Sequence, residues 1–196
     1  MFAGQIMSYA AMDSGKEVTC IPSYGPEMRG GTANCTVVIA DEEIGSPVAK
    51  NPDGALVMNL PSLDKYESMV KPGGALVINA SMVDRPAVRT DITTVAIPCN
   101  EIAEEIGNPR LANMVAIGAL LACMNVLSLA DMETALNNHM PGRHKNLLPK
   151  NIEALSRGAE FAQKSMKKYS TARLHQRRAF SFPSPMLLPG NSIIRE

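Results

Sequence analysis

Residues 55–97 contain three short apolar runs, which read A-L-V-M at 55–58, A-L-V-I-N at 75–79 and T-T-V-A-I at 93–97. Short apolar runs bounded by turn residues are typical of strands that are buried on both faces of a sheet. Between the first two runs, Ser62 is a helix-capping residue type ahead of a helix predicted over 63–70, and Lys71-Pro72-Gly73-Gly74 ends that helix. The alternation of strands with a helix predicts an α/β protein.

The rest of the chain continues this alternation. Apolar residues recur at helical spacing from Phe2, and Asp13-Ser14-Gly15 ends that first predicted helix. Further strands are predicted at 18–21 and 35–40, and further helices at 101–106, 113–129 (with Asn113 as a candidate N-cap), 131–138 and 151–168. The fold class that follows is α/β, with three layers and a Rossmann-like, mixed or mostly parallel sheet that carries helices on both faces.

The length of 196 residues and the 45% hydrophobic content fit one domain with a real core. Nineteen basic and nineteen acidic residues cancel, so no overall field attracts nucleic acid or a membrane surface. Seven basic residues and one acidic residue lie from Lys164 onward, which leaves the body acidic. We predict a single α/β domain over 1–168 and an irregular basic tail over 169–196, which is either solvated or in contact with a partner.

The four cysteines are Cys20, Cys35, Cys99 and Cys123, and no two of them form a C-x-x-C motif. This spacing argues against an iron–sulfur or structural zinc site in the chain, so no metal site is predicted. The start lacks a secretory pattern, and the longest apolar run falls short of the roughly 20 residues that cross a bilayer. We therefore expect reduced thiols, a cytoplasmic location and no membrane partner.

Residues 21–35 read I-P-S-Y-G-P-E-M-R-G-G-T-A-N-C and lie between two predicted strands. The adjacent Gly30 and Gly31 allow the backbone to approach a ligand closely, and Arg29 offers a planar guanidinium to a phosphate or carboxylate. Glu27 can orient that guanidinium or accept a hydrogen bond from a ligand. Composition alone leaves a tight turn without a ligand as an equal alternative.

The whole 21–35 string resembles, almost residue for residue, the signature loop of the gamma subunit (or gamma domain) of 2-oxoacid:ferredoxin oxidoreductases. The resemblance covers roughly residues 2–165. The flanking matches are F-A-G-Q-I at 2–6, G-K-E-V-T at 15–19, N-L-P-S-L-D-K-Y at 59–66, V-K-P-G-G at 70–74, E-I-A-E-E-I-G at 101–107 and N-M-V-A-I-G-A-L at 113–120.

This resemblance implies a subunit of a complex that converts a 2-oxoacid and coenzyme A to acyl-CoA and CO2 while reducing ferredoxin. Alpha and beta subunits would hold thiamine diphosphate with Mg²⁺, and beta or a small ferredoxin-like delta subunit would hold iron–sulfur clusters. The gamma chain would contain none of these cofactors and would be inactive alone. The loop's form favours 2-oxoglutarate or branched-chain 2-oxoacids. The residues implied to face coenzyme A and the joint active site are Ser23, Tyr24, Gly25, Glu27, Arg29, Gly30, Gly31, Thr32 and Asn34.

The N-terminus departs from the family pattern. Members normally begin with a strand and a glycine turn of the form G-x-G-G-Q-G-V, whereas Met1 here directly precedes the F-A-G-Q helix. Without that turn, the anion site at the helix N-terminus is expected to be lost. Without that strand, the sheet is expected to expose an unpaired edge or an apolar groove.

Two smaller signals and one alternative function remain. His139 and His144 flank a turn with no carboxylate at ligand spacing, so a surface or helix-end role is predicted. Cys20 and Cys35 bracket the loop and could lie close together on neighbouring strands, as buried structural thiols. The alternative function is a free-standing nucleotide-binding α/β module, which would need a glycine fingerprint between a strand and a helix.

Overall fold

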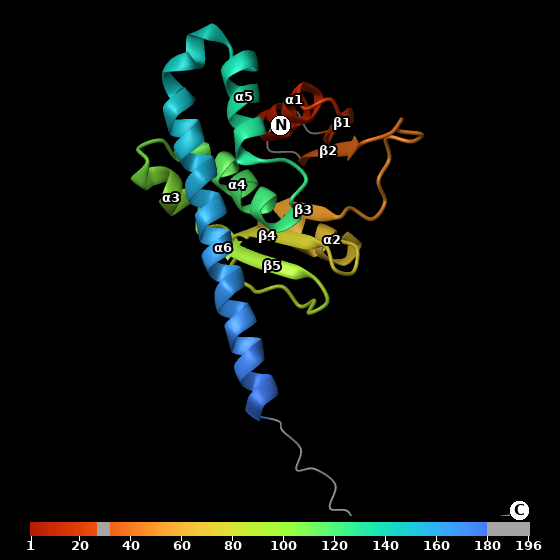
Figure 1. Cartoon of the computed structure of the whole chain (residues 1–196), viewed down its shortest axis with the longest axis vertical. Helices are drawn as coiled ribbons and strands as arrows, with labels where there is room; N and C mark the ends of the chain where they lie inside the picture. The colour runs from red at the N-terminus through yellow and green to blue at the C-terminus, as the bar shows by residue number, and fades with distance from the viewer. Residues whose placement is uncertain (27–31, 180–196) are drawn as a thin grey trace, which may run out of the picture.

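The computed structural model describes residues 1–26 and 32–179. Figure 1 shows a parallel sheet packed among helices, a separate hairpin beside α1, and the long helix α6 running along one side of the molecule. In chain order the elements are α1 (Phe2–Asp13), β1 (Glu17–Tyr24), β2 (Ala33–Ala40), β3 (Gly54–Val57), α2 (Leu60–Tyr66), η1 (Glu67–Met69), β4 (Ala75–Asn79), β5 (Thr93–Ile97), α3 (Cys99–Glu105), η2 (Pro109–Leu111), α4 (Ala112–Met124), α5 (Leu129–His139), η3 (Gly142–Leu147) and α6 (Leu148–Ala179).

The three apolar runs form one parallel sheet in the order β3-β4-β5. Gly54 of β3 lies opposite Ala75 of β4, and Ala75 lies opposite Thr93 of β5, so the three strands start level with one another. Every residue of the central strand β4 is buried. This burial explains why its sequence is continuously apolar rather than alternating.

Helices cover both faces of this sheet, which confirms the predicted α/β fold. Successive residues of β4 point to opposite faces and join different clusters. Ala75 and Val77 pack in the larger cluster with α4 and α6, whereas Leu76 and Ile78 pack in a smaller cluster with Leu63 of α2. The sheet is therefore the middle layer of three, as Figure 1 shows.

Helices α4 and α6 approach so closely that only glycine fits at their contact. A Cβ on Gly118 would lie 2.0 Å from the backbone oxygen of Leu155, and a Cβ on Gly158 would lie 1.9 Å from that of Val115. Reciprocal glycines let two helix backbones touch and bury apolar residues along both helices. The nearly all-apolar character of α4 follows from this position between the sheet and α6.

Strands β1 and β2 form a separate antiparallel pair, called the hairpin below, instead of extending the parallel sheet. Parallel strands need a long crossover, usually a helix, whereas antiparallel strands need only a short connection. The segment 41–53 between β2 and β3 contains no helix, so β2 is not led back into parallel register with β3. Helix α1 packs against the hairpin, and a Cβ on Gly4 would lie 2.7 Å from the Sγ of Cys35.

Three predicted boundaries need correction. The cap of α2 is Asn59, whose side chain accepts a hydrogen bond from the backbone N–H of Ser62, so the helix starts earlier than predicted. The long helix predicted over 113–129 ends at Met124, because Asn125 adopts a left-handed conformation with φ 52°. Asn113 lies inside the first turn of α4 and is not its N-cap.

Helix α5 then starts from a reciprocal cap at Ser128. The side chain of Ser128 accepts from the backbone N–H of Asp131, and the carboxylate of Asp131 accepts from the backbone N–H of Ser128. Such a capping box satisfies two helix-end donors at once. A second helix therefore begins within the stretch that the apolar pattern assigned to one.

The tail predicted to be irregular over 169–196 is helical as far as Ala179. The segment 169–179 contains neither proline nor glycine, and its Arg, Leu, Ala and Gln residues are good helix formers. The prolines that suggested irregular structure all follow Ala179. The division into a domain at 1–168 and a tail at 169–196 otherwise stays a prediction.

Candidate functional site

The hairpin holds the two ends of the signature loop, defined here as residues 23–34, next to each other. Its register runs from Glu17 opposite Ala40 to Tyr24 opposite Ala33 without interruption. Beyond the last strand pair, the N–H of Gly25 donates to the carbonyl of Thr32 over 2.6 Å, which closes the base of the loop. The eight paired positions of β1 and β2 therefore hold both ends of the loop at one end of the hairpin.

The structure brings five of the predicted site residues together at this end of the hairpin. Ser23 lies directly opposite Asn34 in the strand register. Tyr24 is 68% exposed, so its ring is available to a ligand or a partner rather than to the core. The five residues are Ser23, Tyr24, Gly25, Thr32 and Asn34; the other four, Glu27, Arg29, Gly30 and Gly31, lie outside the described residues.

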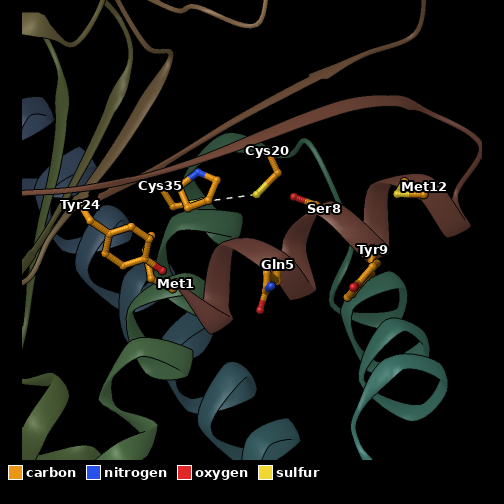
Figure 2. A pocket seen from close by; sticks show the side chains of 9 residues that line it. Met1, Gln5, Ser8, Tyr9, Met12, Cys20, Tyr24 and Cys35 are labelled. Carbon is orange, nitrogen blue, oxygen red and sulfur yellow. Dashed lines mark hydrogen bonds between the residues drawn. The ribbon is translucent and has the colours of Figure 1, made fainter. Parts of the chain in front are cut away.

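A cavity of about 330 Å³ lies between α1 and the face of the hairpin that carries the cysteines. Figure 2 shows that Tyr24, Cys20 and Cys35 line it from the hairpin, while Met1, Gln5 and Tyr9 line it from α1. The hydroxyl of Ser8, which also lines the cavity, donates to the carbonyl of Gly4 within the helix. The described lining combines apolar side chains with the hydroxyls of two tyrosines and the thiols of two cysteines.

Cys20 and Cys35 lie close together, as predicted. Their sulfur atoms are 3.4 Å apart, and both residues are half-buried rather than fully buried. Burial, followed by the contact with Cys20, raises the pKa of the Cys35 thiol to about 11. Cys35 is therefore a protonated thiol at neutral pH and not an activated nucleophile.

A cluster of side chains that connects α1 to α5 has no signature in the sequence. The rings of Tyr9 and His139 stack with their centroids 4.2 Å apart and their planes 12° apart. The Nε2 of His139 lies 3.0 Å from a carboxylate oxygen of Asp13, which lowers the pKa of that carboxyl below its usual value. His139 thus has a helix-end role, as predicted, and only the fold reveals its partners, which are more than 120 residues earlier in the chain.

A second cavity, of about 400 Å³, lies away from the hairpin. It is bordered by Phe2 at the start of α1, by Leu111 before α4, and by Arg110, Arg143 and His144. Within the described part of the chain, neither Arg110 nor Arg143 forms an ion pair with a carboxylate. This concave surface is therefore cationic on an otherwise acidic body, and sequence reasoning missed it because its residues come from distant segments.

Two further features of residues 1–26 and 32–179 bear on function. No helix there combines the length and apolar character needed to cross a bilayer. No group of three or more His, Cys, Asp or Glu side chains there converges as metal ligands.

A parallel sheet between helices together with a separate antiparallel hairpin places this chain in the class of α/β proteins. Residues 1–161 match the model of the pyruvate ferredoxin/flavodoxin oxidoreductase family, and the chain belongs to that family. The resemblance recognised in the 21–35 string is thereby confirmed.

Characterised relatives carry related names. The chain is 37% identical over 166 residues to the 2-oxoglutarate synthase subunit KorC of Methanocaldococcus jannaschii, covering 83% of this chain and 87% of that protein. It is 32% identical over 164 residues to the ketoisovalerate oxidoreductase subunit VorA of Methanothermobacter marburgensis. That match covers 83% of this chain but only 34% of VorA, so the chain spans about a third of that relative's length.

Solved structures show the same fold. The gamma subunit of a keto/oxoacid ferredoxin oxidoreductase from Geobacter sulfurreducens is 30% identical with a TM-score of 0.68, covering 83% of this chain and 90% of that one. A 2-oxoglutarate:ferredoxin oxidoreductase from Magnetococcus marinus, solved with 2-oxoglutarate, coenzyme A and succinyl-CoA bound, has a TM-score of 0.73 at 23% identity. That match covers 84% of this chain and 29% of the other, and it shows the fold alone.

Proposed function

We propose that this chain is the gamma-type subunit of a 2-oxoacid:ferredoxin oxidoreductase and is active only in a complex with alpha and beta subunits. The reaction is the oxidative decarboxylation of a 2-oxoacid with coenzyme A, which yields acyl-CoA and CO2 and reduces ferredoxin. The observation that carries the proposal is the family's signature loop at the exposed end of an ordered hairpin. The names of KorC and VorA support 2-oxoglutarate or a branched-chain 2-oxoacid as substrate.

The donor atoms of this chain fit a division of labour in which other subunits hold the redox cofactors. An iron–sulfur cluster takes about four cysteine thiolates around one centre. Of the four cysteines, only Cys20 and Cys35 are in contact, while Cys99 is buried elsewhere in the core. We therefore assign thiamine diphosphate, Mg²⁺ and the clusters to the alpha, beta or ferredoxin-like delta subunits.

The role assigned to this chain is to bind and orient coenzyme A through the signature loop. Coenzyme A carries phosphate groups, and a guanidinium such as that of Arg29 binds phosphate through paired N–H donors. Gly30 and Gly31 place no side chain between the backbone N–H groups and an anion. Tyr24, near the start of the loop, adds an exposed aromatic face. We place the assembled complex in the cytoplasm.

The alternative function is a free-standing nucleotide-binding module. The glycine fingerprint that it needs between a strand and a helix is absent from the described parallel sheet. The connection from β3 to α2 is Met58-Asn59, and the connection from β5 to α3 is Pro98. Neither contains the glycines that let a pyrophosphate approach a helix N-terminus. Saturable binding of NAD by the isolated chain would favour this alternative.

Recovery of the chain from its native cytosol under anaerobic conditions tests the proposal. A tagged full chain is expected to retain a thiamine-binding pair of subunits and a cluster-binding subunit, identified by mass. The recovered complex should reduce ferredoxin only when a 2-oxoacid and coenzyme A are both present. A chain that is recovered alone, or a complex without this activity, contradicts the proposal.

A further inference from the structure

The pair formed by Cys20 and Cys35 is not used by the proposed function. The two sulfur atoms, at 3.4 Å, are in van der Waals contact without a bond between them. A disulfide bond is about 2.05 Å long, so the sulfurs need to approach by roughly 1.4 Å to bond. No other pair among the four cysteines is in such contact within the described residues.

The strand register explains why the sulfurs meet. Cys20 lies opposite Val37 and Cys35 lies opposite Pro22, so the cysteines are two positions apart and share one face of the hairpin. Diagonal neighbours on one face have Cα atoms about 7–8 Å apart, slightly more than disulfides usually span, so the strands need a small adjustment. Gly25 donates to Thr32, so Pro22 and Cys35 fall in a non-hydrogen-bonded pair of the alternating ladder, where the missing N–H of Pro22 breaks no bond between the strands.

Small reagents can reach the pair. Both cysteines line the cavity between α1 and the hairpin, and both are half-buried rather than enclosed (Figure 2). By contrast, Cys99 is completely buried in the main core. The same cavity that exposes the thiols is therefore the route for an oxidant or a reducing thiol.

We propose that Cys20 and Cys35 are a reversible redox pair that forms a disulfide across the base of the signature loop. With a peroxide as oxidant, one thiol takes an oxygen from hydrogen peroxide to become a sulfenic acid and releases water. The sulfur of the second thiol then displaces the sulfenic hydroxyl, which leaves with its proton as a second water, and the S–S bond forms. The two thiols together lose two electrons and two protons, and a dithiol reductant returns them by exchange.

The disulfide links β1 to β2 at the base of the loop, with Cys20 before the loop in the chain and Cys35 after it. The loop residues 23–34 all lie between the two cysteines in the chain, which are 15 positions apart. Oxidation therefore closes a covalent ring around the whole loop, and this restricts the hairpin in its unfolded and partly opened forms. This inference concerns the thiols alone and does not depend on the reaction of the complex.

Peptide mapping of the full chain tests the proposal directly. The reduced chain is treated with hydrogen peroxide, free thiols are alkylated, and trypsin is added without reductant. Trypsin cleaves after Lys16, Arg29 and Lys50, so Cys20 and Cys35 fall in different peptides, 17–29 and 30–50. We expect these two peptides joined, with a mass lower by two hydrogens than their sum, and separated again by dithiothreitol.

Variants supply matched controls. Cys20→Ser and Cys35→Ser should each abolish the linked peptide, whereas Cys123→Ser should retain it. The oxidised wild-type chain should also melt about 5 °C higher than the reduced chain, and this shift should vanish in Cys20→Ser. The proposal is overturned if both thiols are still free to be alkylated after the peroxide treatment. It is also overturned if each thiol is oxidised separately to a sulfinic acid, or if the disulfide links involve Cys99 or Cys123 instead.

Discussion

The hairpin and the parallel sheet differ sharply in how far their residues are buried. All five residues of β4 are buried, whereas five of the eight residues of β1 are exposed and none is fully buried. The sheet is enclosed by helices on both faces, while the hairpin is supported by α1 and leaves Tyr24 open to its surroundings. The contrast indicates that stability resides in the enclosed layer, and the recognition role that we propose falls on the exposed hairpin.

The largest effect is expected where α4 meets α6. Gly118→Ala places a methyl group 2.0 Å from the carbonyl oxygen of Leu155, and backbone on both helices must move to accommodate it. We expect the free energy of unfolding to fall by about 3 kcal/mol or more in urea titrations. Gly142→Ala is the matched control, because nothing lies within 4 Å of its Cβ position, and it should change stability by no more than about 0.5 kcal/mol. Equal midpoints for the two variants would show that the helix contact is loose.

A smaller loss is expected from Glu67, which is only 7% exposed beside the sheet. Its carboxylate accepts from the backbone N–H groups of Val88 and Arg89 and from the guanidinium of Arg85. In Glu67→Gln, the amide N–H₂ replaces the oxygen that accepted from Arg85, so the amide and the guanidinium face each other as two hydrogen-bond donors. We expect a loss of roughly 1–3 kcal/mol in the free energy of unfolding, measured near pH 7.

The same carboxylate predicts an acid dependence. Burial raises the pKa of Glu67, but the N–H groups of Arg89 and Val88 and the Arg85 guanidinium outweigh burial, so the pKa lies below its usual 4.5. A lowered pKa in the folded state means that this stabilisation is present above the unfolded value and is lost as pH falls through the folded value. Stability measured from pH 6 to pH 3 should therefore fall less steeply in Glu67→Gln than in the wild type. Parallel curves would contradict the assignment.

An intermediate case is the contact between α1 and α5. His139→Ala removes the stack on Tyr9 and should lower the free energy of unfolding by about 1 kcal/mol. His139→Phe retains a ring for the stack but not the contact with Asp13, so it should recover part of the loss. If both variants are as stable as the wild type, the stack contributes nothing measurable.

The smallest effect on stability is expected at the end of the hairpin. Tyr24→Ala removes a ring that is 68% exposed, so the unfolding free energy of the isolated chain should change by less than about 0.5 kcal/mol. Its effect should appear instead in coenzyme A-dependent turnover of the assembled complex. A large loss of stability would place Tyr24 with the enclosed layer and would weaken the contrast between the two regions.

Local patterns in the sequence predicted much of this architecture. The three apolar runs correctly identified β3, β4 and β5, and the 21–35 string identified both the family and the position of the loop between two strands. These features are local because a buried strand or a glycine-rich loop is specified by adjacent residues.

The remaining features depend on contacts between distant segments. The separation of the hairpin from the parallel sheet, the reciprocal glycines 118 and 158, and the buried carboxylate of Glu67 have no local signature. Glu67 is an ordinary helix residue in sequence, and its role is set by an arginine-rich segment about 20 positions later. At the site, the position of the loop between two strands was predictable, whereas the cavity between the hairpin and α1 was not.

The most direct test of the division between a stable layer and a recognition loop is the coenzyme A dependence of the assembled complex with Arg29→Ala. We predict that the KM for coenzyme A rises about tenfold, which is the loss of roughly one charge-assisted hydrogen bond. The mass of the complex and the unfolding midpoint of the isolated chain should stay unchanged. Arg143→Ala, on η3, is the matched control and should leave this KM unaltered. An unchanged KM in Arg29→Ala, with the complex intact, would contradict the assignment of coenzyme A to the signature loop.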